Sequence, residues 1–405
     1  MPCEIRGIKP DEYEELIGIL SNHMMIEKED FATLYKNDPT YKYSLSRVCI
    51  VDKKIVANVH IYDREMHIGK CIVRNGGIGD VLTLPEYRRR GYATSLLNDA
   101  VKYMRENGYD LSMIIGIALY GKVGWEIFPQ DLFTLKVKKK EIPIDHQYTV
   151  RRFEKENDLD SIIKIYEDYN INRSMGIVRS KEYWRKHFYW IRDEREDGFL
   201  VAERKGKIVA YLRCAGFKDE LHLNEICYLK EYKSAISNLL EAILRFAVSR
   251  GYKTINTYLP LDHPLINLLD SMEGAEHKLI EPFGKAGMFF RLINIEGLFN
   301  KMIPCLEERL NNSSLSSYSG FLTFEVSGQI LTLKIKNNKI EISNENKKGI
   351  YLNPNQNMFF KMIMGYCKPS QMKIGEKFSL STKEVELLDI LFPITYPIFW
   401  HSDYY

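Results

Sequence analysis

The run Leu84–Leu97 (LPEYRRRGYATSLL) constrains the fold most, because it joins a strand-like segment to an amphipathic helix pattern through a basic, glycine-containing turn. Gly91 permits a positive φ, and the small Ala93 lets a ligand approach the backbone closely. Successive N–H groups and the start of the helix would then form a site for an anion such as a pyrophosphate. A solvated basic turn before an ordinary helix is the alternative, and a short glycine motif alone does not decide between them.

Length and charge exclude several classes of protein. The 405 residues suffice for two or three domains at roughly 150 residues each. The 57 basic and 54 acidic residues nearly cancel, to a net charge of +3, which argues against a general nucleic-acid-binding protein. The first residues, MPCEIRG, form no apolar leader, and no run reaches the ~20 apolar residues of a membrane span. We therefore expect neither nucleic acid nor a membrane as a partner.

The cysteines are scattered along the chain. They form no CxxC pair, and no histidine cluster has the spacing of a zinc site. This pattern favours free thiols in a reducing cytoplasm and no bound metal. The cysteines are Cys3, Cys49, Cys71, Cys214, Cys227, Cys305 and Cys367.

The first third of the chain has the order of a mixed α/β sandwich. A helix-like start precedes three strand-like runs, and the helix that follows the turn ends at Asn107-Gly108, before another buried strand. The predicted helix is Asp11–Met25, and the predicted strands are Arg47–Val51, Lys54–Tyr62, Lys70–Leu84 and Tyr109–Ile117.

A second copy of this plan begins near Tyr148. Glu231-Tyr232 corresponds to Glu86-Tyr87, and both helices run to a Gly-Tyr pair, eleven residues after a Leu-Leu pair in each copy. The interval from the tyrosine of the Glu-Tyr pair to the second leucine is two residues shorter in the second copy. The missing residues fall in the turn, which in the second copy reads KSAISN and contains no glycine. A repeat with one degenerate copy explains this better than chance similarity, and it leaves one anion site.

The last third changes character. A helix-like segment, Glu296–Leu310, and a polar connector lead into three short strands with tight turns and then two helix patterns. The second of these starts STKE, a capping box. The predicted strands are Phe321–Val326, Gln329–Lys336 and Lys339–Ser343, and the predicted helices are Asn355–Gly365 and Ser381–Leu391. The fold class is therefore α+β.

The Arg-x-x-Gly-x-Ala turn after a strand resembles the acyl-CoA site of the GNAT acetyltransferases. With the tandem copy and the trailing domain, the whole chain resembles the Eis (enhanced intracellular survival) family. That resemblance implies a catalytic GNAT-like domain at 1–146, a degenerate GNAT-like domain at 147–292 and a sterol-carrier-protein-like domain at 293–405. It also implies acetyl-CoA as cosubstrate and a homo-oligomer, a hexamer in the family.

Three motifs carry this resemblance: DVLTLPEYRRRGYA, LYGKVGWEIF and the aromatic end HSDYY. The first implies that strand backbone at Val81 and Thr83 contacts the pantetheine and acetyl group, with Thr83 in place of the usual Val. The family's tyrosine falls at Tyr120, and its terminal carboxylate at Tyr405. The expected cofactor-binding residues are Val81, Thr83, Arg88, Arg89, Arg90, Gly91, Tyr92, Ala93 and Thr94.

Acetyl transfer needs a neutral amine and a proton for the departing thiolate. Tyr120 would donate that proton, because a phenol with a pKa near ~10 stays protonated at neutral pH. The carboxylate of Tyr405 would act as the base or would anchor the amine. Histidines 23, 60, 67 and 401 are weaker alternatives as bases, and an acyl-enzyme at Cys71 weaker still.

Acidic residues near the amine would select cationic acceptors. Candidates are Glu27–Asp30, which also read as a solvated face, and Asp403. We therefore expect a cytoplasmic N-acetyltransferase that acts on aminoglycosides, polyamines or lysine side chains of peptides. The rival interpretation is a non-catalytic protein that binds a lipid or another apolar ligand and has a vestigial CoA site.

Overall fold

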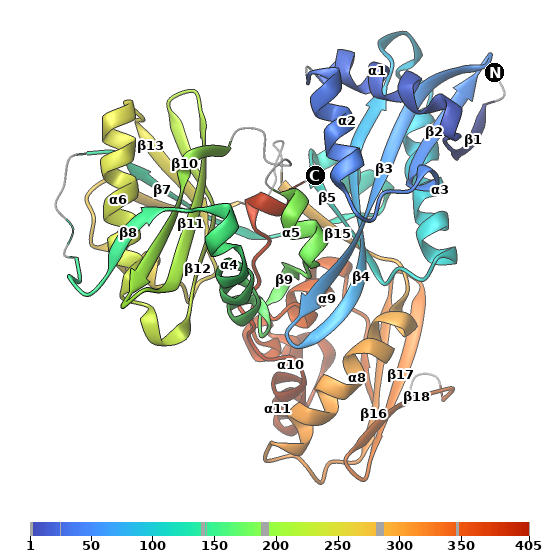
Figure 1. The fold of residues 1–405 in the computed structure, drawn as a ribbon. Coiled ribbons are helices and arrows are strands. Elements are labelled where there is room, and N and C mark those ends of the chain that lie inside the picture. Colours follow the sequence, from blue (N-terminus) through green and yellow to red (C-terminus); the bar gives the residue numbers. More distant parts are fainter. Residues whose placement is uncertain are drawn as a thin grey trace.

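The computed structural model describes residues 3–24, 26–138, 142, 144–187, 194–280, 287–345 and 348–404. Two lobes lie side by side, and a third packs below the first (Figure 1). Among the described residues, none of the helices combines the length and apolar composition that a membrane span requires.

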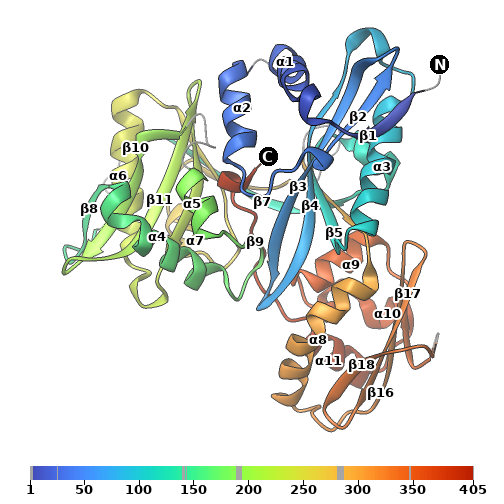
Figure 2. The ribbon, with the colours of Figure 1, turned by 45° about the vertical axis from the view of Figure 1, so that its right-hand side comes forward.

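The first lobe is built on an eight-stranded sheet of described residues. Helices α1 (Tyr13–Met24) and α2 (Lys28–Asn37) cover one face, and α3 (Tyr92–Glu106) covers the other (Figure 2). The sheet order is β1 (Glu4–Gly7), β2 (Ser46–Val51), β3 (Lys54–Ile68), β4 (Cys71–Thr83), β5 (Leu111–Gly116), β15 (Gly287–Leu292) and β6 (Glu126–Phe128), and β9 (Ser174–Ile177) pairs with β3.

Helix α3 forms as the sequence predicts. Its apolar positions Leu96, Leu97, Ala100, Val101 and Met104 are all buried, because they recur at helical spacing and face the sheet. The helix ends at the predicted Asn-Gly pair, where the glycine has a φ of +74°.

The second lobe repeats this architecture. Its helices include α4 (Lys155–Asn170), α5 (Lys181–His187), α6 (Ala235–Arg250) and α7 (Pro264–Asp270). The sheet order is β14 (Ala275–Ile280), β7 (Gln130–Lys136), β13 (Thr254–Tyr258), β12 (Glu220–Tyr228), β11 (Lys207–Phe217), β10 (Glu194–Arg204) and β8 (Thr149–Arg152).

The two lobes exchange strands. Strand β7 follows β6 of the first sheet but pairs with β13 and β14 of the second. Strand β15 follows β14 but pairs with β5 and β6. Each sheet is therefore completed by a strand from the other copy, so the boundary predicted after residue 146 separates β7 from the sheet to which it belongs. The domain boundaries themselves stay a prediction.

The third lobe has a four-stranded sheet beside several helices. All three predicted strands and both predicted helices form, and Ser381 and Glu384 make the predicted capping box. The sequence did not predict β19, which pairs in parallel with β16. Its elements are α8 (Ile295–Asn311), β16 (Gly320–Val326), β17 (Gln329–Lys336), β18 (Lys339–Ser343), β19 (Ile350–Leu352), α9 (Gln356–Ile363), α10 (Ile374–Phe378) and α11 (Thr382–Leu391). Its likeness to sterol carrier proteins stays a prediction.

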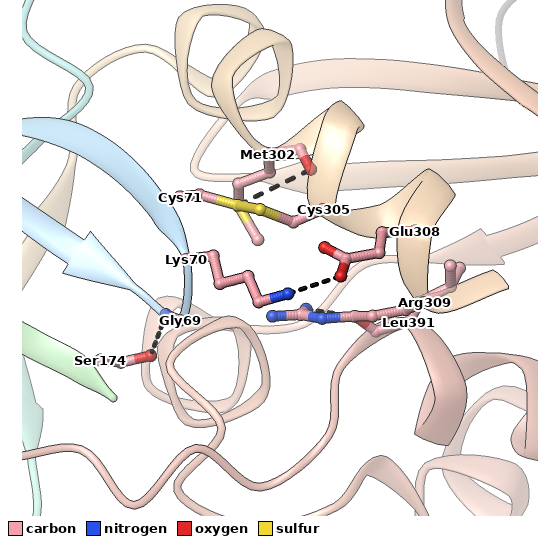
Figure 3. Close-up of a disulfide and its surroundings, with 9 residues drawn as sticks. All are labelled: Gly69, Lys70, Cys71, Ser174, Met302, Cys305, Glu308, Arg309 and Leu391. Carbon is pink, nitrogen blue, oxygen red and sulfur yellow. Dashed lines mark hydrogen bonds and ion pairs between the residues drawn. A yellow bond between two sulfur atoms is a disulfide. The ribbon is translucent and has the colours of Figure 1, made fainter. Parts of the chain in front are cut away.

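One disulfide joins the first and third lobes. Cys71 at the start of β4 is bonded to Cys305 on α8, and their Cα atoms lie 6.4 Å apart (Figure 3). Lys70 and Glu308 form an ion pair of 2.5 Å beside it. The prediction of free thiols is wrong for these two cysteines, because 234 residues separate them and only the docking of α8 on β4 brings them together.

Candidate active site

Strands β4 and β5 diverge at the centre of the first sheet. Their parallel pairing runs from Asn75 and Leu111 to Ile78 and Ile114 and then stops. Strand β5 continues to Gly116 but pairs there only with β15 on its other edge. The last residues of β4 therefore leave their neighbour, and their backbone groups on that side are open to a ligand that enters between the strands.

A β-bulge causes this divergence. His60 of β3 lies opposite Gly79, and Asn58 lies opposite Leu82, so β4 carries one extra residue. Asp80 in the bulge has a φ of +47°, and the Asn58 amide donates a hydrogen bond of 2.9 Å to its carbonyl. The two predicted backbone contacts, Val81 and Thr83, lie on the diverging part of the strand and are partly exposed.

The predicted phosphate turn follows directly. Gly91 precedes the first residue of α3 with a φ of +83°, and Arg89 has a φ of +62°. The first turn of α3 contains no acidic side chain and no side-chain cap, so its N–H groups face solvent at the positive end of the helix dipole. The turn therefore has the backbone of an anion site.

The side chains of the turn divide into two groups. Three arginines, Gly91 and Thr94 are exposed, and Ala93 is partly exposed. The Arg88 Nε atom donates to the Thr83 carbonyl at 3.1 Å, which ties the turn to the end of β4. Tyr92 differs from its neighbours, because its ring is buried in the core under α3 and only its backbone remains at the turn. The three arginines are Arg88, Arg89 and Arg90.

Tyr120 lies just beyond the end of β5, in a short 3-10 helix at Ala118–Val123. Its ring packs directly against Gly116, so closely that a Cβ atom at that position would clash with the ring. Burial raises the pKa of the phenol above its usual value, so the hydroxyl is protonated at neutral pH. A protonated hydroxyl thus lies just after the end of β5.

Tyr405 lies outside the described residues, whereas the residues just before it are described. A short 3-10 helix, His401–Asp403, lies between the first and second lobes (Figure 2). The Arg179 guanidinium donates to both oxygens of the Asp403 carboxylate, at 2.9 and 2.7 Å, and neither side chain is exposed by more than 1%. Asp403 therefore anchors the chain end and does not line an open pocket.

Other candidates from the sequence are either exposed or buried among other side chains. Glu27–Asp30 are exposed at the start of α2. His60 is buried against the rings of Tyr35 and Tyr41, and burial lowers its pKa to about 3, so it is a neutral core residue. His401 is likewise buried, with its pKa lowered to about 4.

Comparison with known proteins identifies the first two lobes. A model of the acetyltransferase (GNAT) domain matches residues 4–128, and a model of the acetyltransferase (GNAT) family matches residues 159–272. The chain belongs to the GNAT superfamily. No curated protein sequence matches it. As a GNAT protein with two such domains, it is an acyltransferase whose cosubstrate is an acyl-CoA.

Solved structures share the fold of this chain over almost its whole length. A GCN5-related N-acetyltransferase from Anabaena variabilis has a TM-score of 0.70 at 16% identity, with 100% of both chains covered. A probable N-acyltransferase from Enterococcus faecalis has a TM-score of 0.70 at 15% identity, with 98% of this chain and 97% of the other covered. Eis1 from Mycobacterium abscessus has a TM-score of 0.65 at 13% identity, with 100% of both chains covered. The fold is therefore Eis-like.

The described part of the second GNAT domain has the same strand arrangement, but another segment lies beside the diverging strands. Its β12 and β13 pair in parallel only from Glu220 and Thr254 to Leu223 and Thr257. The end of the chain fills the space beyond: Trp400 is buried in the core of this domain, and the 3-10 helix that follows packs against β12. The cleft that would receive a cofactor in this copy is thus occupied by the protein itself.

The sequence analysis did not single out Asp80, which lies in the bulge of β4. The hydroxyls of Tyr35 on α2 and Tyr62 on β3 each donate to its Oδ2 atom at 2.7 Å. Burial raises the pKa of this carboxyl, against the effect of the two hydrogen bonds. The signal was its place in the repeat, because Asp80 stands six residues before Glu86 as Glu225 stands before Glu231.

Proposed function

We propose that the protein is an acetyl-CoA-dependent N-acetyltransferase that acts on primary amines of small polycations or on lysine side chains. The diverging strands β4 and β5, which end at an arginine-rich helix N-terminus, carry this proposal. The opening would take the pantetheine arm, and the turn would take the pyrophosphate. The opening and the turn would thus bind two parts of one extended ligand.

The cofactor would be held mainly by backbone groups. The N–H groups of the first turn of α3 would donate to the pyrophosphate, and Arg88, Arg89 and Arg90 would add charge. Val81 and Thr83 would pair with the pantetheine like a neighbouring strand. An N–H of the bulge would polarise the acetyl carbonyl and stabilise the negative charge that develops on its oxygen.

The reaction would proceed by direct attack. The neutral amine forms the new C–N bond, and the C–S electron pair leaves with the CoA sulfur, which takes a proton from Tyr120. The amine first gives one proton to a carboxylate, and after attack its second proton restores the phenol through water. The terminal carboxylate of Tyr405 is the proposed base or anchor.

A continuous series of contacts supports a role for the chain end in the first domain. Tyr183 donates to the Asp403 carboxylate at 3.2 Å, and the Arg64 guanidinium lies 5.3 Å from the ring centroid of Tyr183. Arg64 also lies 5.4 Å from the ring centroid of Tyr62, whose hydroxyl binds Asp80. The last residues are thus linked through β3 to the bulge of β4.

The test is release of CoA thiol by the full chain with acetyl-CoA and a panel of acceptors: an aminoglycoside, a polyamine and an Nα-blocked lysine. We expect an acetylated product by mass spectrometry with at least one acceptor, and weaker turnover in a chain that lacks Tyr405. Lipid binding by calorimetry with no binding of acetyl-CoA would overturn the proposal. A homo-oligomer and a cytoplasmic location belong to the same proposal, and light scattering checks the first.

A further inference from the structure

The two GNAT domains carry an acidic residue at the same place. The four paired positions of β4 and β5 match the four of β12 and β13, at an offset of 145 residues from β4 to β12 and of 143 residues from β5 to β13. The β4-to-β12 offset also relates Asp80 to Glu225, two residues beyond the last paired position in each copy. Both strands also have a bulge there, at Asp80 and Val81 in the first copy and at Asn224 in the second. The two carboxylates are therefore structural equivalents.

In the second domain this carboxylate binds a cation. Glu225 is fully buried, and the Arg179 guanidinium donates to it through Nη1 at 3.2 Å and through Nη2 at 2.5 Å. Burial alone would raise the pKa of Glu225, but the charges of Arg179 and Arg213 lower it below its usual value. The carboxylate next to the bulge of the second GNAT domain thus has room for a planar cation at hydrogen-bond distance.

In the first domain the equivalent position lacks that cation. Two tyrosine hydroxyls bind Oδ2 of Asp80, whereas Oδ1 has no donor among the described residues, and the side chain is partly exposed. The nearby Arg64 is committed elsewhere, because it forms a buried ion pair of 2.8 Å with Asp38. One carboxylate oxygen of Asp80 is therefore left without a protein donor among the described residues, one residue before the backbone proposed to hold the acetyl group.

We propose that Asp80 binds the cationic group of the acceptor and so selects amines that are protonated at neutral pH. This inference rests on the proposed function, because it assigns the substrate class of the same cleft. Tyr35 and Tyr62 hold the carboxylate in place and leave its second oxygen for the substrate. The ion pair of Arg179 with Glu225 in the second domain shows the arrangement that we propose for an acceptor cation and Asp80 in the first.

The probe is butylguanidinium, with butylurea as its neutral isostere. Calorimetry on the full chain saturated with CoA measures binding without any turnover. We expect the wild type to bind butylguanidinium more tightly than butylurea, and Asp80→Asn to weaken the former by about 10- to 100-fold, as loss of a hydrogen bond to a charged group implies. Affinity for butylurea stays unchanged.

Asp52→Asn is the matched control, because Asp52 is exposed in the β2–β3 turn and has a φ of +48°, close to that of Asp80. Asparagine tolerates such a φ, so both variants keep the backbone. Unchanged CoA affinity in Asp80→Asn confirms an intact domain. A loss of CoA affinity there would contradict the assignment, because it would make Asp80 a structural residue.

The inference is overturned if the wild type binds butylguanidinium and butylurea equally, or if Asp80→Asn binds butylguanidinium as the wild type does. The proposed function fails by a different result, namely no acetylated product from any acceptor. In kinetic terms, Asp80→Asn should raise the KM for a cationic amine by the same factor with little change in kcat. A fall in kcat at constant KM would contradict a binding role.

Discussion

The two GNAT domains share one strand register but differ in what occupies the space between the diverging strands. In the first domain the opening leads to exposed arginines and a helix N-terminus. In the second, Trp400 and the residues after it fill that space, and Arg179 neutralises the bulge carboxylate. The second domain thus retains the sheet of the first, but the space between its diverging strands holds the end of the chain.

The turns before the helices show the same contrast. Gly91 precedes α3 in a left-handed conformation, whereas Ser234 precedes α6 with a φ of −67°. The missing two residues remove the loop that would surround a phosphate, and the basic residues of the first turn have one counterpart, Lys233. We therefore expect changes in the first domain to affect catalysis and equivalent changes in the second to affect stability.

The largest effect should follow the loss of the proton donor. Tyr120→Phe should lower kcat by about 100- to 10,000-fold, the usual contribution of general acid catalysis, and leave the Kd of acetyl-CoA unchanged. Tyr252→Phe is the control, since that ring packs against Gly216 in the second domain. Steady-state kinetics of both variants test this prediction. Turnover by Tyr120→Phe at the wild-type rate would exclude Tyr120 as the general acid.

Breaking the buried ion pair of the second domain should chiefly affect folding. Arg179→Met leaves Glu225 and Asp403 buried without their cation, which should cost about 3–5 kcal/mol of the free energy of unfolding. Urea unfolding measures this. Lys253→Met removes an exposed ion pair with Asp219 and should leave the midpoint unchanged. Equal urea midpoints for the two variants would show that the buried ion pairs of Arg179 do not stabilise the fold.

A matched pair of glycines tests the phosphate turn. Gly91 and Gly251 have φ values of +83° and +75°, and at both positions a Cβ atom would have no other atom within 4 Å. Alanine costs about 1–2 kcal/mol of backbone strain at either position. Gly91→Ala should weaken acetyl-CoA binding about tenfold, as strain of this size implies, and Gly251→Ala should leave it unchanged. Similar affinities in the two variants would contradict a role for the turn.

The smallest effect concerns exposed charge. Arg88→Gln should weaken acetyl-CoA binding by about fivefold or less at low salt, and the difference should shrink as salt screens the remaining charges. Lys233→Gln, at the turn of the second domain, should have no effect at any salt concentration. If both substitutions weaken acetyl-CoA binding equally, the turn of the first domain has no special role in binding the cofactor.

The sequence predicted the local parts of this structure well. The bounds of β17 and β18 and the end of α3 follow from alternation, helical spacing and glycine placement, all of which act over a few residues. The exchange of β7 and β15 was missed, because the residue pattern of a strand does not show with which other strand it pairs. The Cys71–Cys305 bond was missed for a similar reason, since its geometry depends on how the third lobe docks.

The candidate site was predicted in part. The glycine turn forms before α3 and Tyr120 follows the end of β5, while the roles of both stay predictions. Asp80 was overlooked, because a bulge is not visible in one strand alone, although extending the repeat one strand upstream would have paired it with Glu225. Asp403 was assigned to an open pocket, whereas Arg179, far away in sequence, buries it.

The stoichiometry of acetyl-CoA binding tests the central claim most directly. Titration calorimetry on the full chain should give one site per chain, because in the described part of the second GNAT domain the end of the chain packs against β12. Gly91→Ala should weaken that one site. Two sites per chain, or a single site that Gly91→Ala leaves untouched, would contradict the division of roles between the two domains.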